Sequence, residues 1–218
     1  MTVMESSPSS SLSWPLRLLA QIISIFFHPV FIPVYLMLFL LFEHPYQYLG
    51  FSSGKKLIVL LQSISMYTFF PLVTVALLRA LRFISSFQLS DRKDRIIPLV
   101  ACGIWYFWIW YIWHNLDSIS AASVQLALAV WLAATLGLLL NIYLKISLHL
   151  LSMGVALCFM VLLSLQESLH YGTWLSVVFI ATGLVCSARL AISDHRPVEV
   201  YGGLVAGALC MLVAWMVG

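Results

Sequence analysis

Charged residues are scarce in this chain, and their scarcity excludes most soluble folds. Asp, Glu, Lys and Arg make up 9% of its 218 residues, whereas soluble domains carry about 25%. Hydrophobic residues make up 62% of the chain, and its mean hydropathy is +1.02. The composition therefore predicts a protein that crosses a membrane several times.

The sequence also lacks the patterns of a zinc, redox or nucleic-acid-binding protein. Its four cysteines lie inside apolar stretches, without the CxxC or Cys/His pairing that indicates zinc or a redox pair. The net charge is only +3, and the basic residues stand at the ends of apolar runs, so no nucleic-acid partner is expected. Residues 1–15 are polar and rich in serine, without a basic start, and we interpret them as an N-terminal tail rather than a cleavable signal.

Long apolar runs supply the candidates for membrane crossing, which takes about 20 residues of helix for a ~30 Å hydrocarbon core. The runs are roughly 16–42, 57–81, 96–113, 121–144, 148–165, 172–190 and 200–217. The first is too long for one straight helix, and His28-Pro29 followed by Pro33 interrupts it. The runs are continuous rather than alternating, which favours helices over strands. We predict an all-α transmembrane bundle of six or seven spans, with residues 16–218 as a single domain.

Three polar islands interrupt the apolar sequence, where ionisable residues are costly unless they are paired, hydrated or used. The islands are Asp91-Arg92-Lys93-Asp94-Arg95, then Lys145-Ile146-Ser147-Leu148-His149, and finally Arg189, Asp194, His195, Arg196 and Glu199. Two predicted spans separate each island from the next, so all three should emerge on one face of the membrane. The cations of the islands themselves dominate the charge bias that usually reports orientation. We therefore expect an integral protein of a cell (inner) membrane and leave open which side the islands face.

Phosphate is the ligand that these islands are suited to bind. A dianion keeps its charge in a low-dielectric site only where cations and hydrogen-bond donors replace its water shell. The candidate groups are the cations of Arg92, Lys93, Arg95, Lys145 and Arg189 and the hydroxyl of Ser147. Any one of these cations is equally well explained by a side chain that reaches for lipid headgroups. The histidines that accompany these cations in the islands favour a phosphate site.

His195 and Glu199 have the spacing of a histidine oriented by a carboxylate. They are four residues apart, one turn of a helix, so the carboxylate can accept one ring N–H and leave the other nitrogen with a free lone pair. Pro197 is tolerated in a first helical turn, which places the start of the last helix at about Asp194 to Arg196. Without a metal, phosphate ester hydrolysis needs a nucleophile and an acid, and two histidines can divide these tasks.

Three segments carry a resemblance to a known family. Ser187-Ala188-Arg189, then five residues and His195, resembles the third signature of the type 2 phosphatidic acid phosphatase superfamily, Ser-Arg-x5-His-x3-Asp, with Glu199 at the aspartate position. Ile146-Ser147-Leu148-His149 resembles the second signature, Pro-Ser-Gly-His. Asp91 to Pro98 resembles the first signature, a lysine followed by six residues and then Arg-Pro, only loosely. The resemblance spans roughly residues 89 to 203.

The resemblance implies a division of roles. His195 would be the nucleophile that forms a phosphohistidine, Glu199 would orient it, and His149 would protonate the leaving group. The phosphate oxygens would be held by Arg189, by Arg92 or Arg95, and by Ser147. The resemblance also implies that the enzyme uses no metal or organic cofactor. The substrate would be a lipid phosphate or an isoprenyl or lipid diphosphate. The phosphoryl group would pass to water or to another alcohol.

Two alternatives remain open. One is a membrane protein that binds or transports an anion or a lipid, and the other is a catalytically inactive relative of the phosphatases. The expected partners are a phosphorylated lipid substrate and the surrounding membrane lipids, and the sequence does not define an oligomeric state. The other histidines stand near predicted membrane interfaces, where amphipathic rings are common, and we interpret them as residues without a catalytic role. They are His28, His44, His114 and His170.

Overall fold

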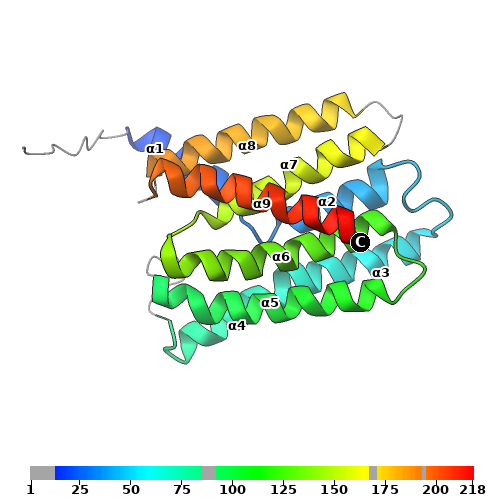
Figure 1. The fold of residues 1–218 in the computed structure, drawn as a ribbon, viewed down its shortest axis with the longest axis horizontal. Helices are drawn as coiled ribbons and strands as arrows, with labels where there is room; N and C mark the ends of the chain where they lie inside the picture. Colours follow the sequence, from blue (N-terminus) through cyan, green and yellow to red (C-terminus); the bar gives the residue numbers. More distant parts are fainter. Residues whose placement is uncertain (1–12, 85–91, 167–170, 193–194) are drawn as a thin grey trace, which may run out of the picture.

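The computed structural model describes residues 13–84, 92–166, 171–192 and 195–218, and within these residues the fold is a helical bundle without a strand (Figure 1). Its helices are α1 (Trp14–Phe26), α2 (Ile32–Leu38), the π-helical turn η1 (Phe39–Glu43), α3 (Ser53–Ile64), the π-helical turn η2 (Ser65–Phe69), α4 (Phe70–Ala80), α5 (Arg92–His114), α6 (Ala121–Tyr143), α7 (Leu148–Gln166), α8 (Gly172–Ile192) and α9 (Pro197–Val217). The prediction of an all-α bundle is confirmed. Most of the predicted N-terminal tail, residues 1–12, lies outside the described residues.

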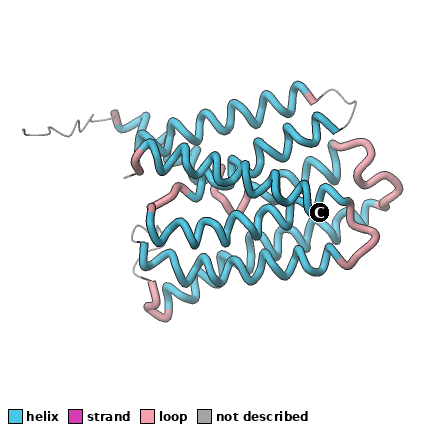
Figure 2. Tube along the Cα trace, in the orientation of Figure 1, coloured by secondary structure: helices cyan, strands magenta, loops and turns pink. Residues whose placement is uncertain are grey.

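Six helices of the described chain are long and apolar enough to cross a membrane. The first is the continuous helix Ser53–Ala80, which combines α3, η2 and α4, and the others are α5 to α9. The first apolar run is divided into two shorter helices, Trp14–Phe26 and Ile32–Glu43. The break contains Pro29, and Pro33 occupies the first turn of α2, as proline chemistry requires. Figure 2 shows this break as a loop between helices.

The three polar islands come together at one end of the bundle. The start of α5, the connection between α6 and α7, and the start of α9 all lie at the left end in Figure 1. The connection between α2 and α3 lies at the opposite end, and α9 runs toward that end to the C-terminus. The ends of α5, α7, α8 and α9 therefore bring polar residues of the three islands into the same region. This arrangement is the one expected from two spans between successive islands.

Helices α7 and α9 pack backbone against backbone. A Cβ atom added at Gly154 would collide with the carbonyl of Leu204, and one added at Gly207 would collide with the carbonyl of Leu151. One added at Gly203 would lie 2.7 Å from the carbonyl oxygen of Ser147. Small residues allow helices in a membrane to approach this closely, because lipid provides no hydrophobic force between them. The close contact fixes the second island relative to the third.

Tryptophan side chains join α5 to the helix Ser53–Ala80. Trp105 donates its indole N–H to the hydroxyl of Thr74 at 3.1 Å, and Trp113 donates to the side-chain carbonyl of Gln62 at 3.1 Å. An indole N–H away from water needs such a partner, because an unpaired donor in an apolar environment is costly. These two bonds hold α5, and with it Arg95, in place against α3 and α4.

Candidate functional site

The first turn of α9 orients His195. Glu199 Oε2 accepts a hydrogen bond from the backbone N–H of Arg196 at 3.0 Å and lies 3.2 Å from Nδ1 of His195. Arg196 is the N-cap residue and Pro197 the first residue of the helix, so the predicted helix start is found. An ionised carboxylate only accepts hydrogen bonds, so Nδ1 carries the ring proton. In the neutral ring, Nε2 then holds the free lone pair that a nucleophile requires.

The environment of His195 favours this neutral ring. Its side chain is 3% exposed, and burial lowers its pKa below the ordinary value. The hydrogen bond to Glu199 opposes this shift and raises the pKa, whereas the nearby guanidinium groups of Arg189 and Arg95 lower it further. The net direction is downward, so at neutral pH His195 is unprotonated and its lone pair is available.

Backbone contacts connect the three islands directly. Arg95, a buried residue of α5, donates from Nη1 to the carbonyl oxygen of Ile146 at 3.1 Å. The backbone N–H of Ser147 donates to the carbonyl oxygen of Glu199 at 3.1 Å. The first island thus contacts the second, and the second contacts the third. Arg95 acquires a fixed position beside the His195–Glu199 pair.

His149 is held by the N-terminal helix rather than by its own island. Its Nε2 lies 3.0 Å from the backbone carbonyl oxygen of Ser24, a buried residue of α1. Its ring also meets the ring of His28 edge to face, with centroids 5.3 Å apart and an interplanar angle of 83°. The second predicted catalytic histidine therefore lies against the break between α1 and α2.

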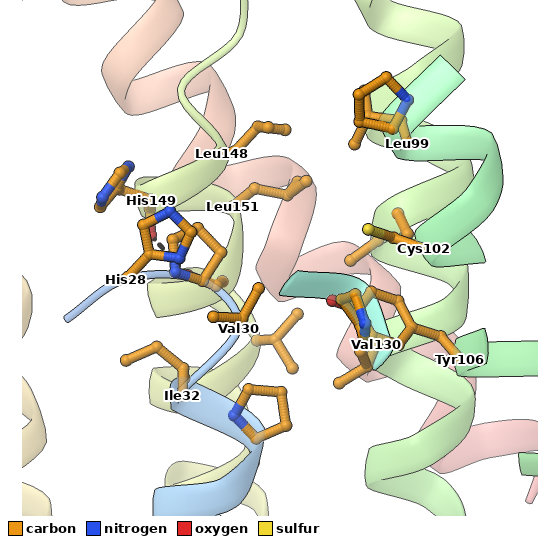
Figure 3. Close-up of a pocket in the computed structure, with 18 of the residues that line it drawn as sticks. His28, Val30, Ile32, Leu99, Cys102, Tyr106, Val130, Leu148, His149 and Leu151 are labelled. Atoms are coloured by element: carbon orange, nitrogen blue, oxygen red, sulfur yellow. Dashed lines mark hydrogen bonds between the residues drawn. The ribbon is translucent and has the colours of Figure 1, made fainter. Parts of the chain in front are cut away.

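The side chains of His195, Arg95 and His149 line one end of a cavity of about 460 Å³. The arginines and histidines of its wall are His28, Arg95, His149, Arg189 and His195. The rest is almost entirely apolar and comes from α2, α4, α5, α6 and α7, with Leu36, Leu99, Tyr106 and Val130 among its residues. Figure 3 shows His28 and His149 side by side on one wall, with Leu99, Cys102 and Tyr106 on the other. The cavity thus has a cationic, histidine-bearing end and a hydrocarbon-like body.

Four of the eight prolines of the chain belong to the wall of this cavity. They are Pro29, Pro33, Pro71 and Pro98. Pro71 is the second residue of α4, which follows the π-helical turn η2, and Pro98 lies inside α5. Proline lacks the N–H of a regular helical turn, and its ring disturbs the local helix geometry. Irregular helices pack less evenly, which leaves room for the cavity between them.

The structure does not bring every predicted phosphate-binding residue to the cavity. Lys145 is half-buried in the connection before α7 and does not line the wall. Ser147 is fully buried, its hydroxyl finds no partner among the described residues, and it lies against α9 rather than on the cavity wall. Arg92 and Lys93 begin α5, but their side chains lie outside the description, as do Asp91 and Asp194 entirely. Arg95 and Arg189 are the predicted cations that reach the wall.

Sequence reasoning missed His28, which it interpreted as an ordinary interfacial ring. The residue lies in the break between α1 and α2 and lines the cavity beside His149. Its one signal in the sequence was the neighbouring Pro29, which breaks a long apolar run at a histidine. By contrast, His44 is buried at the opposite end, where it hydrogen-bonds Tyr171, and His114 is exposed at the end of α5. His170 lies outside the described residues.

The comparisons with known proteins add no relative. The chain matches no protein-family model, no curated protein and no solved structure. Within the described part of the chain, no group of three or more His, Cys, Asp or Glu side chains is placed to hold a metal ion. The cavity and its polar end are therefore the features that bear on function.

Proposed function

We propose that the protein is an integral membrane phosphatase that removes a phosphate from a lipid phosphate or from an isoprenyl or lipid diphosphate. One observation carries the proposal: the cavity joins an end lined by two arginines and three histidines to a body lined by apolar side chains. A molecule that fits this wall has an anionic head and a hydrocarbon chain. Ligand sites of this kind are mainly apolar, with a few polar groups that fix the orientation of the ligand.

The arginines supply the recognition of the head. Arg95 and Arg189 present guanidinium groups, which pair with phosphate oxygens through two parallel hydrogen bonds. Among the described residues, the carboxylate of Glu199 contacts this group of side chains through His195. A phosphate dianion interacts favourably with both guanidinium groups, and Coulomb attraction of this kind is stronger in a partly buried site than in water.

His195 supplies the chemistry. Its Nε2 lone pair attacks phosphorus, the bond to the leaving oxygen breaks, and a phosphohistidine forms. The ring proton stays on Nδ1 of His195, in the hydrogen bond to Glu199. The carboxylate stabilises the positive charge that develops on the ring during the attack. A second histidine donates a proton to the departing oxygen, a role that the family resemblance gives to His149. Water or another alcohol then takes the phosphoryl group from His195.

A protein that only binds a lipid phosphate fits the same cavity. The pair formed by His195 and Glu199 favours the hydrolase, because simple binding gains nothing from a histidine whose lone pair is fixed by a carboxylate. A binding site for a dianion is better served by a protonated ring, and burial lowers the pKa of His195 instead. The orientation and the charge state of His195 both suit a nucleophile.

The test uses the purified protein in detergent with phosphatidic acid, dodecyl phosphate and farnesyl diphosphate, in the presence of a chelator. The hydrolase predicts phosphate release and an acid-labile phosphoenzyme, and both should disappear in His195→Ala. His114→Ala is the matched control, since His114 lies exposed at the far end of α5. Equal phosphate release from the wild type and His195→Ala would remove the proposal. Binding of dodecyl phosphate without any release would support the lipid-binding alternative.

A further inference from the structure

The cavity holds a third histidine that the two-histidine scheme does not use. His28 lies between α1 and α2, and its ring contacts that of His149 edge to face at 5.3 Å. Both rings line the same cavity as His195. His28 comes from a segment far from the three islands in sequence, so its presence here is a property of the fold. The question is which of the two neighbouring histidines serves the leaving group.

His149 has its ring proton already committed. A backbone carbonyl only accepts, so the 3.0 Å contact between Nε2 of His149 and the oxygen of Ser24 requires the proton to be on Nε2. The neutral ring then offers only a lone pair, at Nδ1. To donate a proton to a substrate, His149 would have to break its bond to α1 or carry a second proton. Its position suits a structural connection between α1 and α7.

His28 is placed differently. Its Nδ1 is shut off from solvent and has no hydrogen-bond partner among the described residues. A buried ring nitrogen without a partner is costly, and such a group is more easily explained where a ligand completes its bonding. The ring faces the cavity beside His149 (Figure 3), and the guanidinium of Arg189 lies near enough to act on its charge. His28 thus lies on the wall where a phosphate ester would bind, and its ring is not committed to a protein partner at Nδ1 among the described residues.

We propose that His28, rather than His149, exchanges the proton with the leaving-group oxygen, and that His149 is a positioning residue that packs against the His28 ring. This inference rests on the proposed phosphatase function. As Nε2 of His195 forms its bond to phosphorus, the electron pair of the breaking P–O bond goes to the leaving oxygen, which takes a proton from His28. Neutral His28 then accepts a proton from the attacking water, the P–N bond breaks, and its electron pair returns to Nε2.

The charges around His28 fit this cycle. Burial, and to a lesser extent Arg189, lower the pKa of His28, so the empty site keeps it neutral. The other titratable or cationic groups on the cavity wall are His149, His195, Arg95, Cys102 and Tyr106. A bound phosphate dianion counteracts both burial and the arginine charge, since an anion near a histidine favours its protonated form. The ring therefore acquires its proton together with the substrate that needs it.

Two substrates with the same chain and different leaving groups test the assignment. Dodecyl phosphate releases an alkoxide, which needs a proton as it leaves, whereas 4-dodecylphenyl phosphate releases a phenolate, which needs much less help. Kinetics of the full-length protein in detergent are measured for the wild type, His28→Gln, His149→Gln and the control His114→Gln. Glutamine keeps a hydrogen-bonding side chain but cannot transfer a proton. Hydrolysis of the aryl ester also reports whether each variant is folded.

The expected result is a selective loss in one variant. His28→Gln should lower kcat for dodecyl phosphate by about 10²-fold or more and change kcat for the aryl ester far less. His149→Gln, whose amide can still donate to Ser24, and His114→Gln should show no such selectivity. A selective loss in His149→Gln, or a parallel loss on both esters in His28→Gln, would overturn the inference while leaving the phosphatase intact. A wild type that hydrolyses neither ester would refute the proposed function itself.

Discussion

Replacing Glu199 by glutamine separates the chemical role of this carboxylate from its structural one. Glu199 Oε2 bonds both to Nδ1 of His195 at 3.2 Å and to the N–H of Arg196 at 3.0 Å. A glutamine amide oxygen can still accept the Arg196 N–H and so retains the helix cap. What it loses is the negative charge beside the imidazole. The fold should therefore survive, and the effect should appear in the reaction rate.

The expected loss has two parts. A hydrogen bond to a charged group is worth about 1.5–3 kcal/mol and a neutral one about 0.5–1.5 kcal/mol, so removal of the charge costs on the order of 1–1.5 kcal/mol, about tenfold in rate. The amide can also turn its N–H toward Nδ1, which moves the ring proton to Nε2 and removes the nucleophilic lone pair. The corresponding change in a serine protease triad costs about 10⁴-fold. We expect Glu199→Gln to lower kcat by about 10²-fold to 10⁴-fold.

Steady-state kinetics with dodecyl phosphate, together with thermal unfolding in detergent, measure the two roles. Glu199→Asp serves as the matched variant, because it retains the charge and shortens the arm by one methylene. It should lose less activity than Glu199→Gln, and neither variant should lower the free energy of unfolding by more than a helix cap contributes, about 1 kcal/mol. A glutamine variant as active as the wild type would show that the carboxylate does not orient His195. Equal losses in both variants that track a fall in Tm would indicate a structural role alone.

Three further outcomes follow from the geometry. His195 has a free lone pair only when the pH exceeds its pKa, and that pKa is lowered. We therefore expect kcat/KM to stay constant as the pH falls to about 6.5, the ordinary histidine pKa, and to decrease only below it. A decrease that begins above this pH would contradict a neutral His195. Gly207→Ala should reduce unfolding free energy by about 1–3 kcal/mol through its collision with α7, whereas Gly202→Ala, with open space around its Cβ, should not, as thermal unfolding will show. Val130→Phe should fill part of the cavity and displace about two methylenes of a bound hydrocarbon chain. This should raise KM for dodecyl phosphate about tenfold and hardly change KM for butyl phosphate. Equal effects on both substrates would show that the hydrocarbon chain binds elsewhere.

Local patterns in the sequence predicted the parts of this protein that depend on local geometry. Continuous apolar runs become helices, because lipid leaves the backbone no other partners, and the proline break of the first run appears between α1 and α2. The pair formed by His195 and Glu199 was predictable for the same reason, since four residues make one helical turn. The parity of the spans also placed the three islands at one end before any contact between them was known.

Contacts between distant segments were not predictable in this way. His28 lies 121 positions before His149, and no periodicity in either segment indicates that their rings meet. Ser147 was expected to face a phosphate, yet its backbone pairs with Glu199 and contacts α9, and the residue is fully buried away from the cavity wall. The residues before α7 adopt no regular helix, so the sequence gives no phase for their side chains. Packing of whole helices decides such positions.

The glycine contact between α7 and α9 limits how a lipid can enter. Leu204 and Leu151 touch the opposing helix through their carbonyls at Gly154 and Gly207, so sliding or parting these helices breaks main-chain contacts along their length. These contacts hold α7, which lines the cavity, in a fixed position against α9. Access from the bilayer therefore depends on the walls formed by α2, α4 and α5, each of which contains a proline and none of which makes such a glycine contact. Cross-linking across those walls, rather than across the glycine seam, is the manipulation that would trap a substrate inside or keep it out.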